Sequence, residues 1–114
     1  GGLSVGTPGT PALMATAQQR WGKRAWSALF SEVVSLADNG FTFSPRLATM
    51  VSYDQKHLNR YPSTAAYLLP DGKPVKSGDI LNNLAFAASM RTLGGQGAKA
   101  FYTGAITWGI VDTV

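Results

Sequence analysis

The chain has 114 residues, no cysteine and a formal net charge of +4 at neutral pH. This length fits one domain, and the 45% hydrophobic and 11% aromatic contents argue against intrinsic disorder. The lack of cysteine excludes disulfides, thiolate metal sites and a cysteine nucleophile. Only 14% of the residues are charged, against about 25% in typical domains, which favours a segment that packs against something larger.

The cations are scattered along the sequence, and the densest group is the pair Lys23–Arg24. Cations after a helix end complement the helix dipole, so we do not expect nucleic-acid binding. No apolar run approaches the roughly 20 residues of a membrane-spanning helix, so no membrane span is expected. The chain starts at Gly1 without a methionine or a basic-then-apolar leader. We therefore expect its start to be a boundary within a longer protein, with room for a signal peptide before it.

The first predicted helix follows the turn Gly6–Gly9. Thr10–Pro11 is typical of an N-cap followed by the first helical residue, and Gly22 is typical of a helix end. The apolar residues between them fall at helical spacing: Leu13, Met14, Ala17 and Trp21. The pattern predicts a helix over residues 11–21, with Thr10 as its N-cap, whose apolar stripe faces the core.

Two more helices are predicted before residue 62. Ser27 can cap the second, and Asn39–Gly40 ends it because both residue types tolerate the left-handed conformation. Ser44–Pro45 begins the third, and Pro62 ends it. The expected inward residues are Phe30, Val33, Val34 and Ala37 in the second helix, and Leu47, Ala48, Val51 and Leu58 in the third.

The remainder of the chain predicts shorter elements around one long helix. Ser63 is expected to cap a single helical turn through Leu68, and Pro70–Pro74 is a turn by composition. Asn83 can cap a fourth long helix, with Phe86, Met90 and Leu93 inward, that ends at Gly94–Gly95. Residues 97–102 indicate a short helix, while the β-branched residues of 106–111 suit either a weak helix or a strand.

These elements predict a mainly α fold, a compact helical subdomain of about four to six helices, in a single segment over residues 1–114. The expected core is Leu13, Trp21, Phe30, Val33, Val34, Leu47, Phe86, Met90, Leu93 and Phe101.

His57 is the only histidine and the first candidate for chemistry. Asp54 would be its neighbour on a helix, and an aspartate that orients a histidine is half of a catalytic triad. Ser52 lies nearby in sequence, but no Gly-x-Ser-x-Gly nucleophile motif exists here. With Lys56 and Arg60 beside it, His57 is expected to be a solvated surface residue without a catalytic role.

Two further groups have features of ligand sites. Asp71 and Asp79 bracket a turn, but the alternating oxygens of a calcium loop are missing, so turn and cap hydrogen bonds are expected. Gly94–Gly97 lacks the Lys-Ser/Thr pair of a phosphate-binding loop. Gly6–Gly9 opens onto a helix start that could bind an anion, but Pro8 and Pro11 remove donors, so a structural turn is expected.

Seven aromatic residues could form a stacking platform for bases or sugars, but most are expected to fill the core. They are Trp21, Trp26, Trp108, Tyr53, Tyr61, Tyr67 and Tyr102.

A sparse pattern runs along the chain in a specific order. Its blocks are Val5-Gly6-Thr7-Pro8-Gly9, Gly22, Trp26, Leu29-Phe30, Gly40–Pro45, Pro70-Asp71-Gly72, Gly78-Asp79 and Gly97–Gly104. Together these blocks resemble an internal stretch, from Leu3 to about Val111, of the γ-glutamyltranspeptidase (glutathione hydrolase) family of N-terminal-nucleophile hydrolases. The resemblance implies helices of the large subunit that flank a two-sheet sandwich.

In that family an arginine that binds the substrate carboxylate lies upstream, and the nucleophilic threonine begins the small subunit far downstream. The resemblance therefore implies no catalytic, cofactor-binding or metal residue in this chain, and no cofactor. The implied partners are the rest of the large subunit and the small subunit, in a periplasmic or secreted enzyme.

The implied function is a scaffold fragment, inactive alone, of an enzyme that transfers or hydrolyses γ-glutamyl amides. The sequence departs from the family at Ala25, at or beside Val33–Val34, at Asn83–Leu84 and over residues 52–67. A related acylase, such as one that acts on β-lactam side chains, a poly-γ-glutamate depolymerase and a non-enzymatic helical binding module therefore remain alternatives. A segment of a larger enzyme should also expose an apolar face and self-associate through it, with Tyr53, Tyr61, Ile106, Trp108 and Ile110 the expected members.

Overall fold

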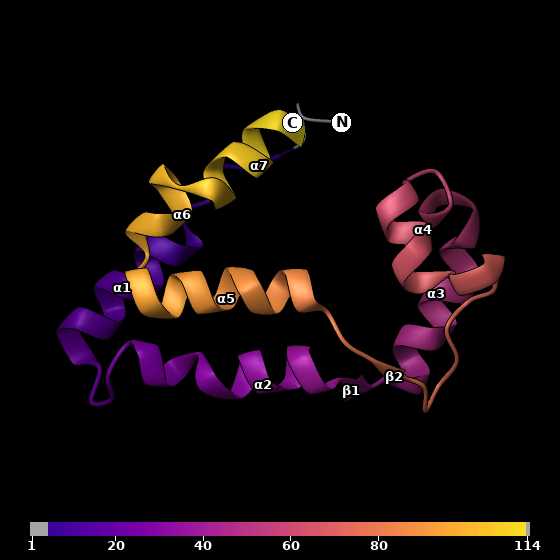
Figure 1. Cartoon of the computed structure of the whole chain (residues 1–114), viewed down its shortest axis with the longest axis horizontal. Helices are drawn as coiled ribbons and strands as arrows, with labels where there is room; N and C mark the ends of the chain where they lie inside the picture. Colours follow the sequence, from indigo (N-terminus) through magenta and orange to yellow (C-terminus); the bar gives the residue numbers. More distant parts are fainter. Residues whose placement is uncertain (1–4, 114) are drawn as a thin grey trace. The chain divides into compact units, whose positions relative to one another are not determined.

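The computed structural model describes residues 5–113, so Leu3 of the family pattern lies outside the described residues. The mainly α class is confirmed (Figure 1). The described part holds seven α-helices, where about four to six are expected, because the stretch over 105–113, left open between helix and strand, forms a helix as well as the predicted short ones. The chain divides into two compact units, one of Gly1–Asp38 with Asn83–Val114 and one of Asn39–Asn82.

The first unit is built from helices that come from both ends of the sequence. They are α1 (Thr10–Trp21), the 3₁₀ helix η2 (Ser27–Leu29), α2 (Ser31–Asn39), α5 (Leu84–Gln96), α6 (Lys99–Thr103) and α7 (Ala105–Thr113). Helix α5 packs against η2 and α6, and α6 packs against α7. An ion pair between Arg91 of α5 and Asp38 of α2 joins these two helices, which lie side by side in Figure 1. Residues 105–113 form helix α7, so the stretch over 106–111, whose β-branched residues suit either a helix or a strand, is helical.

The second unit is a small helical module closed by two paired strands. It contains β1 (Phe41–Thr42), α3 (Pro45–Leu58), α4 (Pro62–Leu68), the 3₁₀ turn η3 (Pro70–Gly72) and β2 (Ile80–Leu81). The strands are antiparallel, with Phe41 opposite Leu81 and Thr42 opposite Ile80. Its core consists of Phe43, Val51, Leu69, Val75 and Leu81.

Several helix boundaries agree with the sequence predictions. The Ser44 hydroxyl accepts a hydrogen bond from Leu47 N at 3.2 Å, and Asn83 Oδ1 accepts one from Phe86 N at 2.9 Å. Both are the predicted N-caps. Helix α2 ends at Asn39, and Gly40 has a φ of +96°, the conformation that glycine adopts without strain.

Other boundaries differ from the predictions. Ser63 does not cap α4, which begins at Pro62 after Tyr61, and Ser27 opens a 3₁₀ turn without a side-chain cap. Gly94–Gly95 does not end α5, which continues to Gln96 and stops at Gly97, whose φ is +79°. The first helix begins at Thr10 itself, one residue before its predicted start.

The predicted core is only partly correct. Leu13, Trp21, Leu47 and Phe86 are 69%, 74%, 40% and 43% exposed, so their placement in a core is wrong. Leu93 is buried, and the other five predicted residues are half-buried: Phe30, Val33, Val34, Met90 and Phe101. Small residues at the helix contacts, such as Ala87 and Ala100, are buried in their place. Helical spacing shows which residues share a face, but not which face meets a neighbouring helix.

Candidate functional site

His57 and Asp54 form the one acid–base pair among the candidates that the structure brings together. Both lie on α3, three residues apart, and His57 Nδ1 is 2.6 Å from Asp54 Oδ1. Their side chains are 63% and 57% exposed, so water surrounds the pair. Ser52 makes no hydrogen bond to His57; it lines a different groove of the second unit, beside Lys76 and Ser77. An exposed pair without a nucleophile is a surface interaction of small energy, as the sequence predicts.

The two aspartates of the loop region shape backbone turns. Asp79 Oδ2 accepts a hydrogen bond from Lys76 N at 2.8 Å, which closes the turn before β2. Asp71 has a positive φ of 53°, a conformation that aspartate tolerates better than most residues. Gln55 of α3 steadies the same loop by donating from Nε2 to the Gly72 carbonyl at 3.1 Å. Within residues 5–113, no three His, Asp or Glu side chains lie together in a way that could hold a metal ion.

At the start of α1, two backbone groups form hydrogen bonds to a side chain from the opposite end of the sequence. The Tyr102 hydroxyl donates to the Pro8 carbonyl at 2.7 Å and accepts from Ala12 N at 3.1 Å. The Ala12 N–H therefore already has an acceptor, and it is one of the free N–H groups that an anion at the helix start would need. The segment Gly6–Gly9 is thus a structural turn, as predicted, and Tyr102 rather than a ligand completes it.

The glycine-rich end of α5 is a packing site rather than a phosphate loop. Gly94 lies within the helix, where an added Cβ would come 3.1 Å from Phe30 Cβ. Trp26 donates from Nε1 to the Leu93 carbonyl at 2.7 Å, and Gly97 N donates to the same oxygen at 3.0 Å. Trp26 also packs against Phe30, with ring centroids 5.0 Å apart. The sequence singled out Trp26 through the family pattern but did not reveal these bonds.

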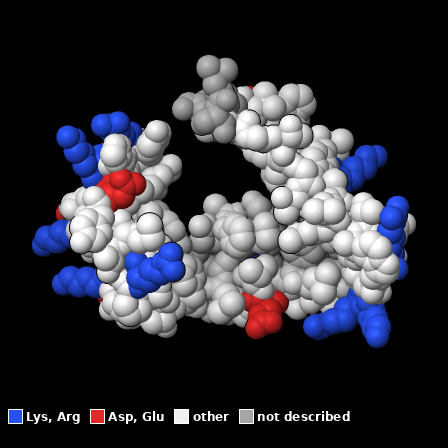
Figure 2. Space-filling view, turned by 180° about the vertical axis from the view of Figure 1, so that it is seen from behind, with Lys and Arg blue, Asp and Glu red and all other residues white. Residues whose placement is uncertain are grey.

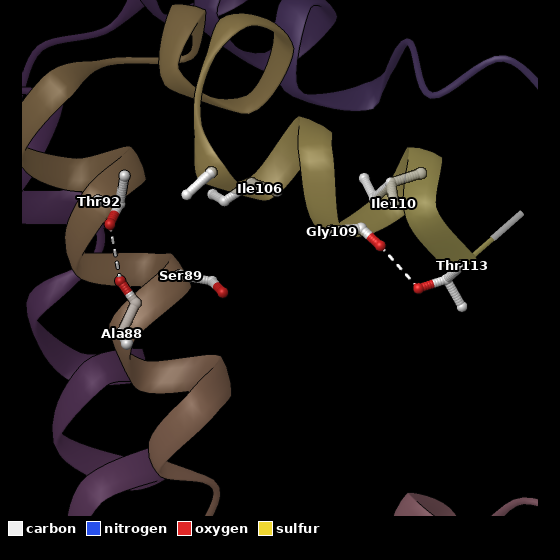
Figure 3. Close-up of a pocket in the computed structure, with 8 residues that line it drawn as sticks. Ala88, Ser89, Thr92, Ile106, Gly109, Ile110 and Thr113 are labelled. Atoms are coloured by element: carbon white, nitrogen blue, oxygen red, sulfur yellow. Dashed lines mark hydrogen bonds between the residues drawn. The ribbon is translucent and has the colours of Figure 1, made fainter.

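An open groove of about 600 Å³ lies between α5 and α7 (Figure 3). Its walls are aliphatic and hydroxyl side chains, including Ser89, Thr92, Ile106, Ile110 and Thr113. The hydroxyls of Thr92 and Thr113 donate to carbonyls of their own helices, those of Ala88 and Gly109. Because no acid, base or cation lines the groove, its walls supply no group for proton transfer.

Large apolar and aromatic side chains are exposed in both units, so the expectation that most aromatics fill the core is wrong for several of them. Trp21 is 74% exposed and Trp108 66% in the first unit, and Tyr53 is 88% exposed and Tyr61 63% in the second. The two ring contacts found in the described part join Trp26 to Phe30 and Phe101 to Tyr102, so the seven aromatics form no common stacking platform. Lys and Arg side chains are spread over the face shown in Figure 2 rather than gathered in one place.

The candidate residues thus form caps, turns and packing contacts, and comparison with known proteins supplies what their geometry does not. A sequence model of the family described as Gamma-glutamyltranspeptidase matches residues 1–114. The chain belongs to the γ-glutamyltranspeptidase family.

Characterised relatives agree with this assignment. The chain is 34% identical over 113 residues, 99% of its length, to the glutathione hydrolase proenzyme of Bacillus subtilis (strain 168), and covers 19% of that protein. It is 30% identical over 112 residues to the acylase ACY 1 proenzyme of Pseudomonas sp. (strain SE83), covering 98% of the chain and 20% of the acylase. The chain therefore spans about a fifth of the length of these relatives.

The fold agrees with a solved structure of the family as well. The crystal structure of Helicobacter pylori gamma-glutamyltranspeptidase matches 90% of the chain with a TM-score of 0.84 and 27% identity, and the match covers 30% of that chain. The chain thus corresponds to one helical part of much longer proteins. None of the described helices is long and apolar enough to cross a membrane.

Proposed function

We propose that residues 1–114 are a single scaffold segment in the large subunit of an enzyme that transfers or hydrolyses γ-glutamyl amides. The observation that supports this most strongly is the 34% identity to a glutathione hydrolase proenzyme over 99% of the chain. The segment supplies packing surfaces and helix geometry to the active site, and none of its residues contacts the reacting atoms. Its partners are the rest of the large subunit and the small subunit.

The chemistry of the whole enzyme follows from an N-terminal nucleophile. A threonine hydroxyl gives its proton to its own free amine and attacks the carbonyl of the γ-glutamyl amide. The C–N bond then breaks, the amine leaves with that proton, and water or an amino acid takes the acyl group from the resulting ester and frees the threonine hydroxyl. Such a mechanism needs an anion-stabilising site and a free N-terminal threonine. The exposed His57–Asp54 pair provides neither, which is why we assign no catalytic residue to this segment.

The test uses the full-length protein that contains this segment. We expect it to release nitroaniline from γ-glutamyl-p-nitroanilide, and we expect the variants His57→Ala and Asp54→Ala to keep kcat within about twofold, because surface residues away from a site change little. A drop of about a hundredfold or more in either variant would place the pair in the catalytic machinery and overturn the scaffold assignment.

A second candidate function is amide hydrolysis of a different acyl group. The 30% identity to an acylase proenzyme favours it, at almost the same coverage as the glutathione hydrolase relative. The same full-length protein, assayed side by side on a γ-glutamyl anilide and on acylated β-lactam amides, separates the two. A preference for the γ-glutamyl substrate supports the first proposal, and a preference for the acylated β-lactam supports the second.

A further inference from the structure

Helix α1 presents its large apolar side chains to solvent. Leu13, Met14 and Trp21 are 69%, 60% and 74% exposed. The residues with which α1 faces the rest of its unit are small or polar: Ala15, Gln18 and Gly22 line a groove with Trp26 and Gly97. The sequence pattern therefore predicts correctly which apolar residues share one face of α1, but this face points away from the core of the unit.

Three cations stand at the C-terminal end of α1, and one of them, Arg24, also lines the groove beside Gln18 and Gly22. Arg20 lies in the last turn of α1, and Lys23 and Arg24 follow it, all exposed. In the described part of the first unit, the one ion pair joins Arg91 of α5 to Asp38 of α2, and none of these three cations has a carboxylate partner. An apolar stripe that runs into unpaired positive charge complements an amphipathic segment with acidic residues at one end.

We propose that this α1 surface (Leu13, Met14, Arg20, Trp21, Lys23 and Arg24) is the docking site of an acidic, amphipathic segment of the same polypeptide that lies outside these 114 residues. The inference rests on the proposed function, in which the segment is built into a longer enzyme. Its support is the length of the relatives, of which the chain covers about a fifth, together with the charge of the surface. The longer chain supplies the occupant, and the three cations select an acidic one.

The test follows oxidation of Met14 by peroxide in the full-length protein, measured by mass spectrometry. Because covered methionines react slowly, Met14 is expected to oxidise at least about tenfold more slowly in the native protein than in the same protein unfolded in guanidinium. A native rate within about twofold of the unfolded rate would overturn the proposal. Protection that appears only with anionic vesicles, or only as protein concentration rises, would also overturn it, because the occupant would then be a membrane or a second copy.

Charge reversal tests the acidic character of the occupant. The variant Arg20→Glu/Lys23→Glu/Arg24→Glu should lose most of the Met14 protection, because like charges would then face each other. The matched control Arg46→Glu/Lys73→Glu/Lys76→Glu changes the net charge equally in the second unit and should keep it. If the triple variant does not fold, salt serves instead: protection of Met14 in the unmodified protein should weaken as ionic strength rises. Met14 protection that charge reversal does not change, or that salt does not change where the variant fails to fold, would contradict an acidic partner.

Activity on a γ-glutamyl anilide, measured on the same preparation, separates this proposal from the proposed function. Protection of Met14 without γ-glutamyl activity would leave the docking surface standing and remove the assigned function. Activity without protection of Met14 would support the proposed function and overturn the docking surface.

Discussion

At the scale of single residues, the family pattern marks side chains that hold the fold together. Trp26 closes the C-terminal end of α5 through its bond to Leu93, and Tyr102 closes the start of α1 through two bonds. Both residues occur in blocks of the pattern, yet nothing in the pattern points to the atoms that they bond. Hydrogen bonds across 67 or more positions depend on tertiary packing, which periodicity along the chain does not encode.

Tyr102→Phe tests the closure of α1. Removing the hydroxyl leaves the Pro8 carbonyl and Ala12 N without their partner, and since both are exposed to water, we expect a loss of about 1 kcal/mol in the free energy of unfolding. Urea denaturation measures it. The matched control is Tyr61→Phe, whose side chain is 63% exposed and whose hydroxyl has no bond in the structure. Equal effects of the two substitutions would show that the Tyr102 bonds add nothing.

At the scale of elements, local rules predicted what local chemistry determines. The caps Ser44 and Asn83 and the stop at Gly40 follow from residue type alone, and the structure has all three. The two-residue strands escaped prediction because so short a stretch has no periodicity to detect. The outward stripe of α1 escaped it for another reason, since composition does not show which neighbours are present.

The glycine pair in α5 offers a direct comparison within one helix. Gly94→Ala should destabilise, because the new Cβ would lie 3.1 Å from Phe30 Cβ and 3.2 Å from its Cγ. Gly95→Ala has open space around its Cβ and should stabilise by roughly 0.5–1 kcal/mol, the usual gain from alanine in a helix. Thermal unfolding of the two variants gives the signs. A stabilising Gly94→Ala would mean that η2 and α5 can move apart at no cost.

Ser44, which precedes α3, and Ser63, which lies within α4, together test the corrected start of α4. Ser44→Ala removes the oxygen that accepts from Leu47 N and should cost about 1 kcal/mol. Ser63→Ala should change stability by less than about 0.5 kcal/mol, because Ser63 lies inside α4 and does not cap it. Denaturant midpoints of both variants, compared at equal m-value, decide the matter; a larger loss at Ser63 would restore it as the cap.

At the scale of the whole molecule, exposed apolar surface remains on the chain taken by itself. Trp108 and Val111 of α7 are 66% and 61% exposed, while Ile106 and Ile110 are half-buried in the groove wall. Such patches on a soluble chain usually mark contact surfaces. We therefore expect the 114-residue chain to self-associate, with a sedimentation coefficient that rises with concentration. A single monomeric species at the highest concentrations would contradict this.

We infer that this chain is scaffold, and that the groups which perform the chemistry lie elsewhere in the enzyme. The most direct measurement is nitroaniline release from γ-glutamyl-p-nitroanilide by the purified 114-residue chain, run beside the full-length protein. We expect release by the full-length protein and a rate for the 114-residue chain equal to the buffer blank, because no N-terminal threonine can form from this chain. Release by the chain above the blank, or no release by a folded full-length protein, would contradict it.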